Sequence, residues 1–159
     1  MTPDKIIFLD IDGPMIPYTS FLFNTHASFD QELDDRCVKV LRKIIDASGA
    51  KIVFNTTHNT MLYPSETDTV PGLINQFTKV GFAADIHPTV CTIYPDVDRK
   101  TAILRWLNEN GSEGRKWVVL DDVEIRDVRA YLTDADLGIG IGEYNHCAEW
   151  LEFKRFIAL

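Results

Sequence analysis

Short apolar runs alternate along the chain with longer segments of helical periodicity. The apolar runs stand at 5–10, 51–55 and 116–120. The segments with an apolar residue at every third or fourth position cover 31–48, 70–80 and 98–109. Runs of the first kind are typical of buried parallel strands, and segments of the second kind are typical of amphipathic helices. The alternation predicts an α/β fold, a Rossmann-like three-layer sandwich with a mostly parallel central sheet.

The first long helix, over 31–48, has more than one candidate for its beginning. Ser28 and Gln31 have the spacing of a capping box, in which two side chains satisfy backbone N–H groups at the start of a helix. Asp30 is an alternative cap. Gly49 is expected to end the helix, because glycine readily adopts the left-handed conformation that follows a last helical turn.

The remaining elements have weaker patterns. A strand is expected within 83–93, where Pro88 either confines it to an edge of the sheet or interrupts it. A short helix over 124–131, a strand over 137–141 and a final helix over 147–156 complete the predicted order. With 159 residues and no linker or repeat, we expect one domain over 1–159.

Charge and composition limit the classes of partner. The formal net charge of −8 argues against tight binding to long nucleic acid, which usually requires a basic surface. No apolar run approaches the roughly 18 residues of a membrane span. The first residues lack the basic stretch and apolar segment of a secretory signal. We therefore expect a cytoplasmic protein with no membrane partner, and we leave open whether it forms a homo-oligomer.

The first apolar run leads directly into two carboxylates. Asp10 and Asp12 follow Ile6–Leu9, and Gly13 comes next. Residues two apart on a strand point the same way, so both carboxylates would face one cavity. Two negative charges that close repel unless a cation or a shared proton relieves them. This pattern predicts a cation site, with a plain polar turn as the alternative.

Three later signals follow the acidic pair in a fixed order. Thr56 ends the second apolar run, Lys100 opens a helix, and Asp121 and Asp122 end the third run. Together with Asp10, this ordered set resembles the four motifs of the haloacid dehalogenase (HAD) superfamily of phosphotransferases. The resemblance spans residues 5–127 and implies a single HAD-like hydrolase domain.

The resemblance implies a mechanism and a metal ion. Asp10 matches the nucleophile that forms an aspartyl-phosphate, and Asp12 matches the general acid and base, whose backbone carbonyl also binds the metal. Asp122 matches the direct carboxylate ligand of Mg²⁺, because Asp127 follows it at the acidic spacing of the family. Asp121 is then a second ligand or acts through a water molecule. The alternative is that Asp121 and Asp122 cap the helix expected at 124–131.

Two residues match the phosphate-binding positions of the family. Thr56 matches the hydroxyl that donates to a phosphoryl oxygen. Lys100 matches the cation that neutralises the nucleophile and the phosphate. Arg99 is adjacent, and a shift of one residue would exchange the two.

Two irregular segments, 13–29 and 58–69, follow strand ends, where ligands of open α/β sheets bind. Residues 13–29 either form a flap over the site or pack on the edge of the domain. Tyr18, Phe21 and Phe23 in this segment could then stack on a base or another flat group. Both segments are too short for the cap domains of many relatives, which implies a capless or small-flap member. Pro14 departs from the threonine or valine usual in the family, and it removes one backbone N–H near the site.

We expect a Mg²⁺-dependent phosphomonoesterase. The net charge favours phosphorylated small molecules, above all nucleotides, as substrates. The first alternative is a phosphatase acting on 3′ or 5′ phosphorylated nucleic acid ends, because the chain is similar to HAD domains of nucleic acid repair proteins. The second alternative is a catalytically idle domain that binds phosphate or a partner.

Overall fold

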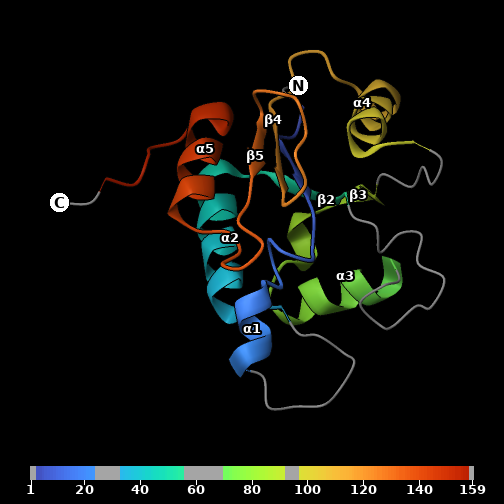
Figure 1. Cartoon of the computed structure of the whole chain (residues 1–159). Coiled ribbons are helices and arrows are strands. Elements are labelled where there is room, and N and C mark those ends of the chain that lie inside the picture. Colours follow the sequence, from blue (N-terminus) through green and yellow to red (C-terminus); the bar gives the residue numbers. More distant parts are fainter. Residues whose placement is uncertain (1–2, 24–32, 56–69, 92–96, 158–159) are drawn as a thin grey trace.

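The computed structural model describes residues 3–23, 33–55, 70–91 and 97–157. A five-stranded sheet runs through the centre, with helices on both of its faces (Figure 1). The strand order is β3-β2-β1-β4-β5, and every pairing is parallel. The prediction of an α/β Rossmann-like sandwich is therefore confirmed. No helix among the described residues is long and apolar enough to cross a membrane.

The strands are short and in register at their carboxyl ends. Their bounds are Ile6–Leu9 (β1), Lys51–Phe54 (β2), Ile86–Cys91 (β3), Trp117–Asp121 (β4) and Ala130–Leu132 (β5). Leu9, the last residue of the central strand, pairs with Phe54 on one side and with Leu120 on the other. Residues that follow these three strands therefore emerge at the same edge of the sheet.

The helices lie in two layers around the sheet (Figure 1). Their bounds are Tyr18–Phe23 (α1), Asp35–Ser48 (α2), Val70–Lys79 (α3), Arg99–Asn110 (α4) and Ile141–Leu151 (α5). Buried side chains of α2, α3 and α5 belong to one core cluster, and those of α4 belong to the other. Helices α2, α3 and α5 therefore cover one face of the sheet, and α4 covers the opposite face.

The central strand β1 contributes to both cores. Ile7 and Leu9 face the cluster that contains α2, whereas Ile6 and Phe8 face α4. The Phe8 ring meets the Trp106 ring edge to face at a centroid distance of 5.4 Å. All four residues of the strand are fully buried, so its carboxyl end is held in place from both faces.

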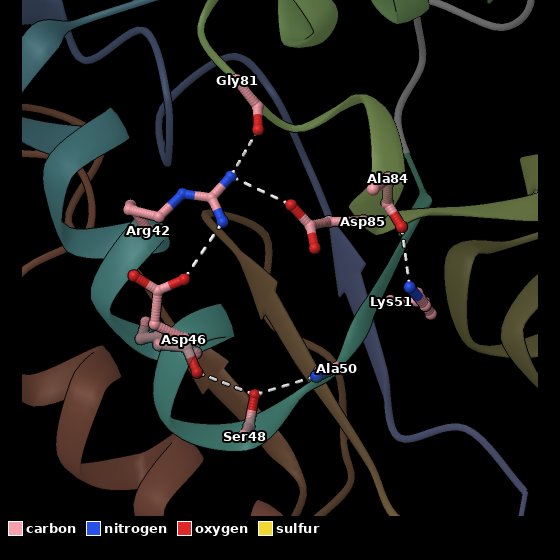
Figure 2. A network of polar contacts seen from close by, with 9 residues as sticks. Arg42, Asp46, Ser48, Ala50, Lys51, Gly81, Ala84 and Asp85 are labelled. Atoms are coloured by element: carbon pink, nitrogen blue, oxygen red, sulfur yellow. Dashed lines mark hydrogen bonds and ion pairs between the residues drawn. The ribbon is translucent and has the colours of Figure 1, made fainter.

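A polar network joins α2 to the turn after α3 (Figure 2). Arg42 Nη2 donates to the carbonyl oxygen of Gly81 at 2.7 Å and to Asp85 Oδ2 at 2.9 Å. Its Nη1 donates to Asp46 Oδ1 at 3.1 Å. The guanidinium carbon also lies 4.2 Å from the centre of the Phe82 ring. One side chain thus fixes the position of the chain before the edge strand β3.

The predicted start of the first long helix is wrong. The helix begins at Asp35, and its N-cap is Asp34, whose carboxylate accepts from the backbone N–H groups of Arg36 and Cys37. The caps predicted at Ser28 and Asp30 lie outside the described residues. The predicted end is confirmed, because Gly49 adopts the left-handed conformation with φ of 71°.

The predictions for the region after β4 are also corrected. No helix forms over 124–131, since Asp127 accepts the backbone N–H of Arg129 in a local turn before β5 begins. No strand forms over 137–141. Gly138 has φ of 74° and donates to the carbonyl oxygen of Asp134, which makes a turn there. The final helix, α5, then begins six residues earlier than predicted and ends at Leu151.

Candidate active site at the carboxyl edge of the sheet

Backbone hydrogen bonds between strands fix the residues that follow them. Asp10 N donates to the carbonyl oxygen of Leu120 at 3.0 Å, directly after β1. Thr133 N donates to the carbonyl oxygen of Asp121 at 2.8 Å, directly after β5. Because these bonds continue the parallel ladders, the side chains at this edge are placed by the sheet.

Three carboxylates meet at this edge and form what we call the acidic cluster: Asp10, Asp121 and Asp122. Each offers one carboxylate oxygen, and these oxygens lie within 4.8 Å of one another. Asp10 is 2% exposed and Asp121 is 1% exposed, whereas Asp122 is partly exposed. Three carboxylates this close, two of them buried, carry a large electrostatic cost unless cations compensate them.

Arg99 supplies one compensating charge. Its Nη1 lies 3.2 Å from Asp10 Oδ2 and donates to Asp121 Oδ1 at 2.5 Å. Arg99 is the first residue of α4, whose N-terminus is capped by Asp98. The helix thereby directs the guanidinium to the end of the sheet. Three carboxylates and one guanidinium leave two negative charges, which is the charge that one divalent cation would neutralise.

The excess of negative charge in the acidic cluster affects the pKa values of its carboxyl groups. Burial, and then the negative charge of Asp121, raise the pKa of Asp10 to about 8, although Arg99 opposes the shift. A hydrogen bond with the Asp122 side chain acts in the same direction as burial. Burial also raises the pKa of Asp121, against the hydrogen bond and charge of Arg99. Without a further cation, the cluster therefore retains a proton near neutral pH.

The donor set fits a hard divalent cation. Asp121 Oδ1 accepts from Arg99 and from the backbone N–H of Val123 at 2.9 Å. Asp121 Oδ2 is buried without a hydrogen-bond partner. A buried carboxylate oxygen without a donor is unfavourable unless a ligand satisfies it. Oxygen atoms from two or three carboxylates are the protein ligands that Mg²⁺ prefers.

Gly13 lies against the cluster at its third carboxylate. A Cβ atom built on Gly13 would come within 2.7 Å of Asp122 Oδ2, and the glycine has φ of +99°. Its N–H donates to the carbonyl oxygen of Ile16 at 3.1 Å, which closes the turn after β1. Both the contact and the conformation require glycine. The sequence pattern included Gly13 but gave no sign of its contact with Asp122.

The structure brings Asp10 but not Asp12 into the acidic cluster. The strand ends at Leu9, so the alternation that would align the two carboxylates does not continue. Asp12 is exposed and forms an isolated bridge with Ile16. Its expected roles, as acid and base and as a carbonyl ligand of the metal, remain predictions.

Of the two predicted phosphate-binding residues, Thr56 and Lys100, the structure describes only Lys100. Thr56 lies outside the described residues, and so does the segment 58–69. Lys100 is partly exposed, and its Nζ donates to the carbonyl oxygen of Arg126 at 2.5 Å. The cation beside Asp10 is Arg99, so the structure corrects our preference for Lys100. The only sequence signal for Arg99 was its adjacency to Lys100.

The segment 13–29 is described up to residue 23, and the side chains of residues 21–23 are not described. Residues 13–17 are buried, as expected for chain that packs on the edge of the domain. The short helix α1 follows, and Tyr18 N donates to the carbonyl oxygen of Ala135 at 2.9 Å. Tyr18 is 63% exposed at the start of this helix. The existence of a flap remains a prediction.

A protein-family model matches residues 6–139, which is well over half of the chain. Its description is "HAD domain in Swiss Army Knife RNA repair proteins". The matched range contains the whole acidic cluster and Arg99. No curated protein and no solved structure matches the chain significantly.

Proposed function

The chain belongs to the family of HAD domains found in Swiss Army Knife RNA repair proteins, and on this premise we propose that it is a Mg²⁺-dependent phosphomonoesterase with Asp10 as its nucleophile. Membership supports a phosphatase-type function in general. The observation that supports Mg²⁺ dependence and Asp10 as the nucleophile is the acidic cluster at the carboxyl edge, with Arg99 in contact with Asp10.

The proposed reaction has two covalent steps. In the first, a carboxylate oxygen of Asp10 forms a bond to phosphorus, and the ester bond to the leaving oxygen breaks. In the second, water attacks the aspartyl-phosphate, inorganic phosphate leaves, and the Asp10 carboxylate is restored. Burial on a rigid strand end holds Asp10 in one position for both steps, which lowers the entropic cost of attack.

Charge is the main obstacle to the first step, because both the nucleophile and the phosphate are anionic. Arg99 lies close enough to Asp10 to offset part of this repulsion. Mg²⁺ held by Asp10, Asp121 and Asp122 would supply the rest as positive charge at the reacting oxygen atoms. Asp10 attacks as a carboxylate, and its pKa of about 8 in the metal-free cluster makes a cation necessary for full ionisation near neutral pH.

Proton transfer is assigned to Asp12. In the first step it gives its proton to the leaving alcohol oxygen, and in the second it takes a proton from the attacking water. The exposed position of Asp12 on the turn beside the cluster suits contact with a leaving group that reaches the site from solvent. Thr56 is proposed as a donor to a phosphoryl oxygen.

The family description bears on the substrate. Its reference to RNA repair favours phosphorylated RNA ends over the free nucleotides that the net charge suggested. An overall charge of −8 opposes binding along a polynucleotide but not contact with one end of it. The exposed ring of Tyr18 could stack on the terminal base.

The test is phosphate release, in the presence of Mg²⁺, from a panel of matched substrates. The panel contains RNA oligonucleotides with a 3′ or 5′ phosphate, the corresponding nucleoside monophosphates, sugar phosphates and an aryl phosphate. We expect the highest kcat/KM on an RNA end, and inhibition by beryllium fluoride, which mimics a phosphorylated aspartate. If free nucleotides give the higher value, the reaction class stands and the substrate assignment is overturned. If no member of the panel releases phosphate, the catalytic proposal fails.

A further inference from the structure

A hydrogen bond joins two basic residues, one directly after Arg99 and the other four residues after Asp122. Lys100 Nζ donates to the backbone carbonyl oxygen of Arg126 at 2.5 Å. Lys100 follows Arg99 in the first turn of α4, and Arg126 lies four residues after Asp122 in the loop before β5. The bond therefore ties the start of α4 to the loop that leaves the cluster.

Arg126 is exposed and Lys100 is partly exposed, and the proposed reaction uses neither side chain. In the described part of the chain, neither side chain forms a salt bridge with a carboxylate, in contrast to Arg99. Nearby carboxylates are engaged with backbone groups. Asp98 accepts the N–H of Thr101 at 2.7 Å, and Asp127 accepts the N–H of Arg129 at 2.9 Å.

The side chains of Arg99 and Lys100 point in different directions from the start of α4. Arg99 projects to Asp10, while Lys100, one residue later and about 100° further around the helix, projects to the adjoining loop. A phosphate attacked by Asp10 would thus lie beside Arg99, and the next anionic group of the same substrate could meet Lys100 and Arg126.

We propose that Lys100 and Arg126 form a subsite for a second phosphate group, the phosphodiester next to the terminal phosphate that Asp10 attacks. This inference rests on the proposed function and extends it, because it makes an oligonucleotide a better substrate than a mononucleotide. The bond uses the backbone carbonyl of Arg126 and not its guanidinium. A small local subsite of this kind would allow a protein with a net charge of −8 to bind the end of a nucleic acid.

The first experiment compares selectivity between substrates that differ by one phosphate group. The substrates are a nucleoside 5′-monophosphate, the corresponding nucleoside 3′,5′-bisphosphate and a 5′-phosphorylated RNA oligonucleotide. In Lys100→Gln and Arg126→Gln, the preference for the oligonucleotide, as a ratio of kcat/KM values, should fall about tenfold through a higher KM. Lys100→Arg should restore most of the preference, since it keeps the charge and a donor. If the bisphosphate is preferred over the monophosphate as strongly as the oligonucleotide is, the second phosphate is recognised without a polynucleotide.

A second experiment measures binding without catalysis. The anisotropy of a labelled, phosphorylated RNA oligonucleotide gives its affinity at several salt concentrations. Each lost phosphate contact should reduce the slope of log affinity against log salt by about 0.7. Lys154→Gln is the matched control, because it removes one exposed charge from the C-terminal tail, on the other side of the molecule from α4 (Figure 1).

The outcomes separate the two proposals. If wild-type protein releases no phosphate but Lys100→Gln and Arg126→Gln still lower the salt slope, the subsite stands and the proposed reaction fails. If phosphate is released but both variants behave like Lys154→Gln in selectivity and in salt slope, the subsite is disproved and the reaction stands.

Discussion

Gly13 lies so close to Asp122 that a methyl group at position 13 would meet the Asp122 carboxylate at 2.7 Å. Gly13→Ala should therefore displace Asp122 and strain a backbone with φ of +99°. A non-glycine residue in such a conformation costs about 1–3 kcal/mol. We expect a lower Tm and a smaller rise of Tm on adding Mg²⁺, both measured by thermal unfolding.

The chain offers a control for this variant. Gly81 has φ of +96°, and a Cβ atom there would meet nothing within 4 Å. Gly81→Ala should share the backbone strain while keeping the full stabilisation by Mg²⁺. Equal Mg²⁺ responses in the two variants would show that the contact between Gly13 and Asp122 does not shape a metal site.

Asp10→Asn should make the metal-free protein more stable at pH 8. The folded pKa of Asp10 is about 8, above its ordinary value of 3.8, so the folded state holds this proton more tightly than the unfolded state. The resulting stability is complete below about pH 4 and is lost as the pH rises through about 8. The amide avoids this loss. We expect a gain of about 1–3 kcal/mol at pH 8, or about 2–4 °C in Tm per kcal/mol.

The measurement is thermal unfolding in chelator at pH 5 and pH 8. The difference between wild type and Asp10→Asn should grow with pH. Asp35→Asn is the control, because Asp35 is an exposed carboxylate in the first turn of α2. A wild type as stable as Asp10→Asn at pH 8 would mean that the buried cluster has no excess of negative charge.

Arg99→Gln should reduce turnover of an aryl phosphate more than Lys100→Gln does. Arg99 contacts Asp10 and Asp121, whereas Lys100 contacts the Arg126 backbone. Loss of a group that stabilises transition-state charge costs about 10²–10³ in kcat, and Arg99→Lys should recover part of it. The order of the two losses decides the assignment. A greater loss in Lys100→Gln would restore the sequence-based preference for Lys100.

Arg42→Ala should destabilise the fold without a specific effect on the site. The side chain donates to Gly81, Asp85 and Asp46 (Figure 2). Its guanidinium carbon also lies 4.2 Å from the centre of the Phe82 ring. We expect a loss of about 1–3 kcal/mol in the free energy of unfolding, measured with denaturant, because several hydrogen bonds to a charged group are removed together.

Arg36→Ala is the matched control for this network. Arg36 lies on the same helix, its side chain is 70% exposed, and its ion-pair distance to Asp34 is 3.5 Å. An exposed pair of this kind contributes little. Equal losses in the two variants would argue that the Arg42 network does not stabilise the attachment of α2 to the rest of the fold.

The sequence predicted the centre of the fold because its signals there are local and mutually consistent. The runs that became β1, β2 and β4 are almost wholly buried, and apolar runs of that length have few alternatives in an α/β chain. Parallel strands then place Asp10, Asp121 and Asp122 at one edge. The meeting of these carboxylates was therefore predictable from order and direction alone.

The failures occurred where a short-range hydrogen bond or a helix rotation decides the structure. Asp127 forms a turn with Arg129 in place of the helix expected over 124–131, and Gly138 takes a left-handed turn in place of a strand. Adjacent residues on a helix point about 100° apart, so the choice between Arg99 and Lys100 depends on how α4 is rotated against the sheet. That rotation is set by tertiary packing of Ile103 and its neighbours, which the sequence does not reveal.

The most direct measurement of the central claim is phosphate release from an aryl phosphate by wild type and Asp10→Asn, each in chelator and in excess Mg²⁺. An aryl phosphate tests the reaction without depending on the substrate assignment. We predict turnover only for wild type with Mg²⁺, since the amide cannot act as the nucleophile and the metal-free cluster retains a proton. Undiminished turnover in chelator, or a near-normal rate for Asp10→Asn, would contradict the proposal that Asp10 attacks phosphorus at a Mg²⁺ site.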